Sequence, residues 1–338
     1  MIQAKAATIN GQAPATSDAA SVLTCLRGTR TFVMCAHEKP DADVLASGFA
    51  LGLALKSMGK RIVYFLDDDV PRNLQFLPEA GLTRRSFEGV DDGAIFVFLD
   101  MSDKVRAGRA LEWVPAERIV NIDHHLGNKR FGRWNYVLEG EAATGVLALN
   151  IIVGLGVTIS PAIATCLLAT LIADTGCFMY SNASPRTIRL ASSLMEAGAD
   201  KEAITEQLYQ TRSFEGQKVL GRALDRATLT DDRICYSIVT QDMLREFGAS
   251  HEDLEDVVGA LRAVERCDVA ALLKETDEGD YRLSMRSRGP FNVMEIAKGL
   301  GGGGHFRAAG ASLPGPLEKA IASMLQAIRA QMWVRPGT

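Results

Sequence analysis

The first half of the chain alternates short apolar runs with longer helical patterns, and this alternation limits the folds open to it. The runs are rich in β-branched and aromatic residues and cover residues 31–35, 61–66, 94–99 and 118–122. A helical pattern from Asp43 to Met58 separates the first two runs. The run AIFVFL at 94–99 is apolar throughout, as expected of a strand buried on both faces. The alternation predicts an α/β fold with a mostly parallel sheet and helices on both sides.

No charged residue occurs between Ala142 and Ala173, a length that invites a membrane interpretation. Glycines at 154 and 156 and the pair Ser160-Pro161 interrupt this stretch, so that each half is too short to span a bilayer. Ser160 in front of a proline is typical of a helix start. We therefore expect two buried helices here and no contact with a membrane.

The second half predicts a smaller α/β block. Strands are expected at 233–239, 269–273 and 281–285, and helices at 292–298 and 317–332. Ser250, with Asp253 three residues later, predicts a further helix start. We expect a domain boundary near residue 215. The segments are a flexible tail at 1–19, a first domain at 20–199, a helical connector at 200–228 and a second domain at 229–338.

The formal net charge of −4 argues against a protein that binds long duplex nucleic acid through bulk charge. A short or mononucleotide substrate fits this charge better. The six cysteines form no CxxC pair, and the first twenty residues lack an apolar signal region. Both observations favour free thiols in a reducing compartment, and thus a cytoplasmic protein.

Four of the five histidines lie in three short motifs. These motifs are HEKPDAD at 37–43, DHH at 123–125 and GGGGH at 301–305. Asp100 ends the AIFVFL run, and Asp174 ends the uncharged stretch. Sites in open parallel sheets are built at the carboxyl ends of strands, where several of these residues fall. Each alone has a plainer explanation as a cap or a hydrogen-bonded core residue, but together they predict a metal centre.

Aspartate and histidine supply the oxygen and nitrogen ligands that divalent metals need. Two ions about 3.5–4 Å apart can bind both an attacking hydroxide and the phosphoryl oxygens, and carboxylates offset their charge. Soft ligands are few, which disfavours structural zinc. The donor set favours two Mn²⁺ ions, with Mg²⁺ as the alternative.

In this order the motifs resemble those of the DHH/DHHA1 phosphoesterases, a family that includes RecJ-like nucleases. The resemblance rests on residues 37–43, 98–103, 123–125, 174–176, 284–287, 301–305 and 308–310. The two-domain size is most similar to the bacterial oligoribonuclease (nano-RNase) and pAp phosphatase branch. The resemblance implies an N-terminal DHH domain, a C-terminal DHHA1 domain and an active-site cleft between them. Ala42 and Ala46 depart from glycines that many members carry, but neither change removes a ligand.

The resemblance also implies roles for single residues. One metal would be held by His37, Asp41 and Asp100. The other would be held by Asp43, Asp100, His124 and Asp174, with Asp100 as the bridge. Asp123 would support the ligands, and His125 would lie close to the phosphate as a charge stabiliser or acid.

The glycine run in the second half permits close backbone approach, and its amides can cradle an anion. A flexible linker is the plainer interpretation of four glycines. Arg286 and Arg288 suit bidentate phosphate contacts, or else lie on a solvated edge strand. The resemblance implies substrate contacts from Arg286, Ser287, Gly302, Gly303, Gly304 and His305. Whether Lys298 and Arg307 add positive charge near the substrate is left open.

The leading hypothesis is a Mn²⁺-dependent hydrolase whose partners are short RNA oligonucleotides and pAp. It would release 5′-mononucleotides from the former and AMP from the latter. A cyclic or linear dinucleotide phosphodiesterase is the first alternative. A manganese inorganic pyrophosphatase would need a Ser-Arg-Lys signature that the chain lacks. The intact ligand set speaks against a nonenzymatic nucleotide sensor. Whether the protein is a homodimer is left open.

Overall fold

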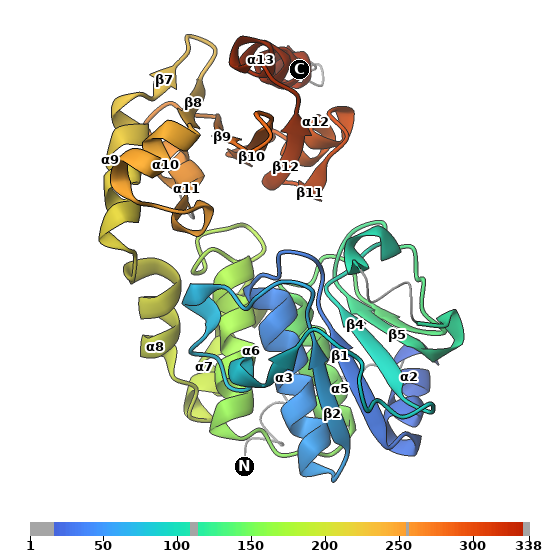
Figure 1. The fold of residues 1–338 in the computed structure, drawn as a ribbon. Coiled ribbons are helices and arrows are strands. Elements are labelled where there is room, and N and C mark those ends of the chain that lie inside the picture. Colours follow the sequence, from blue (N-terminus) through green and yellow to red (C-terminus); the bar gives the residue numbers. More distant parts are fainter. Residues whose placement is uncertain (1–16, 109–113, 255–256, 334–338) are drawn as a thin grey trace. The chain divides into compact units, whose positions relative to one another are not determined.

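The computed structural model describes residues 17–108, 114–254 and 257–333. They form two units that meet in the chain between Thr211 and Arg212, and each unit has its own sheet (Figure 1). The tail expected at 1–19 lies outside the described residues as far as residue 16, and helix α2 begins at Ser17. None of the helices in the described ranges combines the length and the hydropathy of a membrane span.

The sheet of the first unit has six strands in the order β3-β2-β1-β4-β5-β6, and every neighbouring pair is parallel. The strands are β1 Thr31–Cys35, β2 Arg61–Phe65, β3 Thr83–Arg84, β4 Ile95–Leu99, β5 Ile119–Asp123 and β6 Trp134–Val137. The apolar runs predict β1, β2, β4 and β5, whereas β3 and β6 are short and carry half-buried residues that give no such signal. The strand order reverses between β1 and β4, and ligands of such sheets bind at this point.

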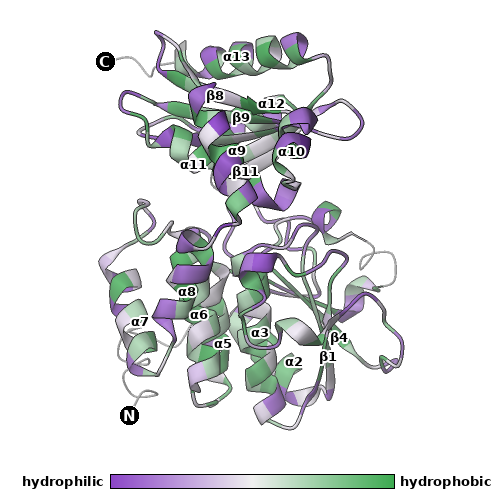
Figure 2. Cartoon of the chain, turned by 60° about the vertical axis from the view of Figure 1, so that its left-hand side comes forward, coloured by the Kyte–Doolittle hydropathy of each residue, from purple (hydrophilic) through white to green (hydrophobic). Residues whose placement is uncertain are grey.

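The α-helices of the first unit pack on one face of this sheet. They are α2 Ser17–Gly28, α3 Ala42–Ser57, α5 Thr144–Gly154, α6 Pro161–Asp174, α7 Pro185–Glu196 and α8 Lys201–Thr205. The uncharged stretch forms α5 and α6 as predicted, and both are buried in the core together with α3 (Figure 2). The other face, around Val33, Phe65 and Phe96, packs among the described residues against connecting segments that include Phe87 and Phe131. Helices were expected there as well; the described residues on this side include the 3-10 helix Lys104–Ala107, and residues 109–113 after it lie outside the described ranges.

The sheet of the second unit has the order β11-β12-β10-β9-β8-β7. Only the pair β8 and β9 is parallel. Its strands are β7 Thr228–Leu229, β8 Ile234–Val239, β9 Val269–Glu275, β10 Tyr281–Ser287, β11 Gly303–His305 and β12 Ala308–Leu313. Its helices are α9 Phe214–Asp225, α10 Gln241–Phe247, α11 Val257–Arg262, α12 Val293–Gly299 and α13 Leu317–Trp333. Separate apolar clusters cover the two faces, one with α12 and α13 and one with α9, α10 and α11.

Two predictions in the second unit differ from the structure in detail. The helix expected after Ser250 starts as a 3-10 turn, His251–Leu254, and α11 begins at Val257, beyond residues 255–256, which the structure does not describe; Ser250 Oγ donates to Asp253 Oδ2 over 3.0 Å. The glycine run does not stay a loop, because Gly303–His305 pair with Ala308–Gly310 as strand β11. Glycine lets the backbone approach a neighbouring strand closely, so a glycine run can enter a sheet edge.

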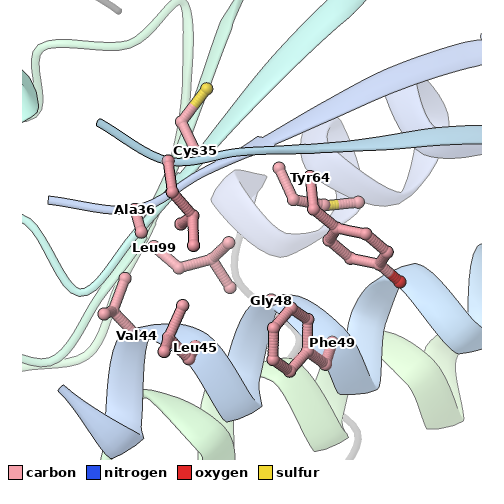
Figure 3. Close-up of a pocket in the computed structure, with 10 residues that line it drawn as sticks. Cys35, Ala36, Val44, Leu45, Gly48, Phe49, Tyr64 and Leu99 are labelled. Atoms are coloured by element: carbon pink, nitrogen blue, oxygen red, sulfur yellow. The ribbon is translucent and has the colours of Figure 1, made fainter. Parts of the chain in front are cut away.

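A small apolar cavity of about 10 Å³ lies between the sheet and α3 in the first unit (Figure 3). Gly48 of α3 lies on its wall, opposite Leu99 and Met34. A Cβ atom at Gly48 would lie 3.7 Å from Leu99 Cδ1 and 3.9 Å from Met34 Cβ, which are ordinary contact distances. The site therefore has room for one methyl group.

We predict that Gly48→Ala raises the free energy of unfolding by about 1 kcal/mol, because alanine favours the helix and fills space. Gly52→Ala, one turn further along α3, is the matched control. Its Cβ would lie 2.3 Å from Tyr64 Oη, and this overlap should lower stability by about 1–3 kcal/mol. Urea unfolding of both variants checks the pair. Equal destabilisation by both changes would show that the space beside Gly48 does not exist.

Candidate metal centre

The predicted ligand residues gather at the carboxyl edge of the first sheet, next to the reversal of strand order. His37 follows β1, and Asp100 follows β4. Asp123 ends β5, with His124 after it, while Asp43 lies in the first turn of α3. Asp100 has a φ of 56°, in the left-handed region that is uncommon for residues other than glycine. Backbone strain of this kind is concentrated at functional sites.

His37 forms one group with two carboxylates. Its Nε2 lies 3.8 Å from Asp41 Oδ2 and 3.7 Å from Asp100 Oδ2. Its Nδ1 is 2.8 Å from the carbonyl oxygen of Glu38, so the ring proton is on Nδ1 and the Nε2 lone pair faces the carboxylates. Nε2 of His37 is buried and has no hydrogen-bond partner among the described residues. A cation between the three atoms would satisfy it.

His124 forms a second group with the same ring orientation. Its Nδ1 donates to the carbonyl oxygen of Glu141 over 2.9 Å. Its Nε2 lies 3.3 Å from Asp174 Oδ2, 3.4 Å from Asp100 Oδ1 and 3.8 Å from Asp43 Oδ2. Asp100 thus turns Oδ2 to the first group and Oδ1 to the second. Ligand atoms about 2.1 Å from one ion stand about 3–3.5 Å apart, so both groups fit a divalent ion after small adjustments.

The carboxylates of this cluster carry more negative charge than a buried site tolerates. Burial raises the pKa of Asp43 well above its usual range, and Asp174 and Asp100 raise it further. Burial also raises the pKa of Asp174, to about 7, although His124 opposes the shift. Burial would raise the pKa of Asp100 too, but His124 and His37 outweigh burial and hold it well below its usual range. Divalent cations would offset this charge in place of protons.

Asp43 also caps a helix that belongs to another part of the chain. The N–H of Thr144 donates to Asp43 Oδ2 over 2.7 Å, and that of Gly145 donates to Asp43 Oδ1 over 3.2 Å. These are the first amides of α5, whose own N-cap residue, Ala143, offers no side-chain hydrogen bond. The Thr144 hydroxyl donates to Asp100 Oδ1 over 2.9 Å. The start of α5 therefore orients two candidate ligands, a role that the sequence does not reveal for an uncharged Thr-Gly pair.

Asp123 and His125 form a buried pair behind the cluster. His125 Nδ1 lies 2.7 Å from Asp123 Oδ1, and Asn128 Nδ2 donates to Asp123 Oδ2 over 2.5 Å. Burial would raise the pKa of Asp123, but the bond to His125 outweighs it and the pKa is lowered. Burial would lower the pKa of His125, but Asp123 and Asp100 outweigh it and the pKa is raised. His125 is therefore biased towards the protonated form, 3.5 Å from Asp100 Oδ1.

The residues expected to contact substrate lie in the second unit. Arg286 is on β10, where its Nη1 donates to the carbonyl oxygen of Met285 over 3.0 Å. The Ser287 hydroxyl is buried and donates to the carbonyl oxygen of Phe291 over 2.7 Å, so it holds the following turn. Gly302 is required locally, because a Cβ atom there would lie 2.1 Å from the Gly310 carbonyl oxygen. The side chain of His305 lies outside what the structure describes, and its expected contact stays a prediction.

We predict that Gly145→Ala disturbs the metal centre through packing alone. A Cβ atom at Gly145 would lie 1.9 Å from Thr170 Oγ1 and 2.6 Å from Thr170 Cβ on α6. Relief of this overlap requires α5 or α6 to shift, and a shift at the start of α5 would disturb its hydrogen bonds to Asp43. We expect stability to fall by about 3 kcal/mol and hydrolysis to fall about a hundredfold, the cost of a displacement near 1 Å.

Gly154→Ala, at the other end of α5, is the control for this change. Its Cβ would meet only the flexible end of Leu23, at 2.9 Å from Cδ1, so activity should stay within about twofold of the unmodified protein. Thermal unfolding and initial hydrolysis rates measure both variants. Full activity in Gly145→Ala would show that the start of α5 does not set the ligand geometry.

Comparison with known proteins identifies two family domains in the chain. The family model described as "DHH family, N-terminal domain" matches residues 31–171, and the "DHHA1 domain" model matches residues 231–333. The "Bifunctional oligoribonuclease and PAP phosphatase NrnA" of Thermus thermophilus is 35% identical over 315 residues, which is 93% of each chain. The protein of the same name from Bacillus subtilis is 23% identical and covers 84% of this chain and 89% of its own.

A solved structure shows the same fold at lower identity. It is an exopolyphosphatase-related protein from Bacteroides fragilis, with a TM-score of 0.86 and 22% identity. The alignment covers 94% of this chain and 97% of that one, so both units have counterparts in it.

Proposed function

The chain belongs to the DHH/DHHA1 phosphoesterase family, and from that premise we propose that it hydrolyses short oligoribonucleotides and pAp. The products would be 5′-mononucleotides from the former, and AMP with phosphate from the latter. The observation that carries this proposal is that Asp100 turns one carboxylate oxygen to His37 and the other to His124, each of which stands among further carboxylates. The names of the relatives that match over nearly the whole chain supply the substrate class.

We assign the two groups to two Mn²⁺ ions, with Mg²⁺ as the alternative. His37, Asp41 and Asp100 would hold one ion, and Asp43, Asp100, His124 and Asp174 the other. When bound, such a pair polarises a water molecule and offsets the charge of the phosphoryl oxygens. The carbonyl oxygens of Glu38 and Glu141 accept the Nδ1 protons of His37 and His124, which leaves Nε2 of each ring free of that bond and able to hold an ion.

The other residues of the centre would supply charge near the phosphate or hold the metal ligands in position. His125, whose pKa the hydrogen bond to the buried Asp123 raises against the effect of burial, would place positive charge or a proton near the phosphate. Thr144 would hold Asp100 in its bridging orientation. In the second unit, Arg286, Ser287, Gly302, Gly303, Gly304 and His305 are proposed to bind the nucleotide, with Ser287 acting through the turn that it fixes. We also propose a cytoplasmic location, where all six cysteines would stay reduced.

The experiment that tests this function offers both substrates at once. The protein is incubated in Mn²⁺ with equal amounts of pAp and a 5′-phosphorylated diribonucleotide, and the products are separated by chromatography. We expect both to yield 5′-mononucleotides, and the ratio of rates ranks them. If both survive, the proposed function is wrong, and cyclic dinucleotides and pyrophosphate become the next substrates to try.

A further inference from the structure

The turn that follows Asp174 adopts an unusual backbone. Gly176, Cys177 and Phe178 have φ values of 56°, 55° and 65°, so three consecutive residues lie in the left-handed region. Only glycine enters this region without a steric cost, and the other two residues are strained. Strain of this kind persists only where the surrounding structure holds it in place. The role of Asp174 as a candidate ligand does not explain how the strained turn after it is held in place.

Asn182 holds the turn from its far end. Its Nδ2 donates to the carbonyl oxygen of Asp174 over 3.1 Å and to that of Ala142 over 3.2 Å. Because both partners are acceptors, the NH₂ group must face them, and the orientation of the amide is fixed. The Asp174 carbonyl is at the end of α6 and has no partner within the helix. Asn182 therefore ties the end of α6 to the segment that leads into α5.

That second segment orients three of the candidate ligands. The carbonyl oxygen of Glu141, next to Ala142, accepts the Nδ1 proton of His124. Thr144, two residues after Ala142, donates its N–H to Asp43 and its hydroxyl to Asp100. One side chain thus connects the backbone of Asp174 to the backbone that orients the other ligands of the second group.

We infer that Asn182 is a positioning residue that fixes the separation between Asp174 and the His124–Asp43 side of the second group. This inference rests on the proposed function, because it takes that group as a metal site. Asn182 donates to neither His37 nor Asp41, and it reaches the shared ligand Asp100 only indirectly, through the segment that carries Thr144, so the first group should depend on it much less. Loss of a hydrogen bond that orients ligands typically weakens metal binding about 10–100-fold.

The test is calorimetric titration of the metal-stripped, full-length protein with MnCl₂. In Asn182→Leu, which keeps the side-chain volume, one of the two binding events should weaken about 10–100-fold and the other should stay within about twofold. Asn135→Leu is the matched control. Asn135 is also half-buried and holds a turn, donating to the Gly132 carbonyl oxygen over 2.6 Å, but this turn lies at the β6 end of its connection, away in sequence from His124 at the β5 end. Both binding events should survive in the control.

Thermal unfolding in EDTA separates positioning from plain structural support. Both variants should lose similar stability without metal, and only Asn182→Leu should lose Mn²⁺ affinity. Unchanged affinity in Asn182→Leu, with the unfolding temperature lowered, would overturn the inference. If Asn182→Leu does not fold, Asn182→Ala is titrated in its place and judged by the same criteria.

The result for the unmodified protein keeps the two proposals apart. Two Mn²⁺ binding events without hydrolysis of pAp or diribonucleotide would overturn the proposed function alone. Two events and normal hydrolysis, with identical affinities in the Asn182 variant, would overturn the positioning role alone. Fewer than two Mn²⁺ binding events in the unmodified protein would overturn both proposals.

Discussion

Asp100→Asn is expected to lower kcat on pAp and on a diribonucleotide roughly a thousandfold or more, because a shared metal site supplies several kcal/mol of transition-state stabilisation. Asp100 turns one carboxylate oxygen to His37 and the other to His124. Asparagine keeps the size but lacks the charge and one of the two acceptor oxygens. Because His37 and His124 hold the pKa of Asp100 low, the native side chain is ionised and its charge is what the variant removes.

Asp103→Asn is the matched control for this variant, because Asp103 belongs to the same FLDMSD segment. Its carboxylate pairs with Lys129 over 2.5 Å and accepts from the N–H of Val105 over 3.4 Å, outside both ligand groups. Steady-state rates should change by less than about twofold in this control, since surface ion pairs contribute little. Circular dichroism shows whether both variants are folded. A folded Asp100→Asn protein with normal turnover would remove the bridging role.

Removal of metal is expected to abolish hydrolysis completely. Protein dialysed against EDTA and returned to metal-free buffer should show no turnover above background, and Mn²⁺ should restore it. Binding should also raise the unfolding temperature, because an ion that binds only the folded state adds about 2.7 kcal/mol at a hundredfold excess over its Kd. The physical reason is the cluster of the buried Asp43 and Asp100 with the half-buried Asp174, whose mutual repulsion a cation relieves.

A comparison of hydrolysis rates with three different ions tests the metal assignment. Mn²⁺ and Mg²⁺ suit the mixed oxygen and nitrogen donors, with Mn²⁺ preferred, whereas Ca²⁺ prefers more oxygen ligands at longer distances. Initial rates measured with each ion after EDTA treatment should follow the order Mn²⁺, Mg²⁺, Ca²⁺. Full turnover in EDTA would contradict a metal-dependent mechanism outright.

The sequence predicts the centre of the fold well because strand and ligand signals coincide there. Apolar runs give β1, β4 and β5, and each run ends directly at an aspartate or leads to a histidine. In a parallel sheet the carboxyl ends of neighbouring strands meet at one edge, so residues such as His37 and Asp100 are brought together by topology. The rule accounts for His37, Asp100 and His124, whereas Asp43 in α3 and Asp174 at the end of α6 are placed by helices.

The supporting residues could not be predicted, because loop conformation places them. Thr144 and Asn182 are ordinary helix-start and turn residues in sequence, and the partners Asp43 and Asp100 of Thr144 and Ala142 of Asn182 lie far away along the chain. For the glycine run, local composition predicts the wrong kind of structure. Its composition indicates a loop, yet pairing with β12 turns part of it into a strand, since Gly302 and Gly304 leave room for the neighbouring backbone. Local propensity could not show that partner.

The anomalous scattering of a Mn²⁺-soaked crystal tests the central claim most directly. We expect two peaks about 3.5–4 Å apart, both in contact with Asp100. One peak should also touch His37 and Asp41, and the other His124 and Asp174. A single peak, or peaks away from Asp100, would contradict the two-ion centre proposed for this protein.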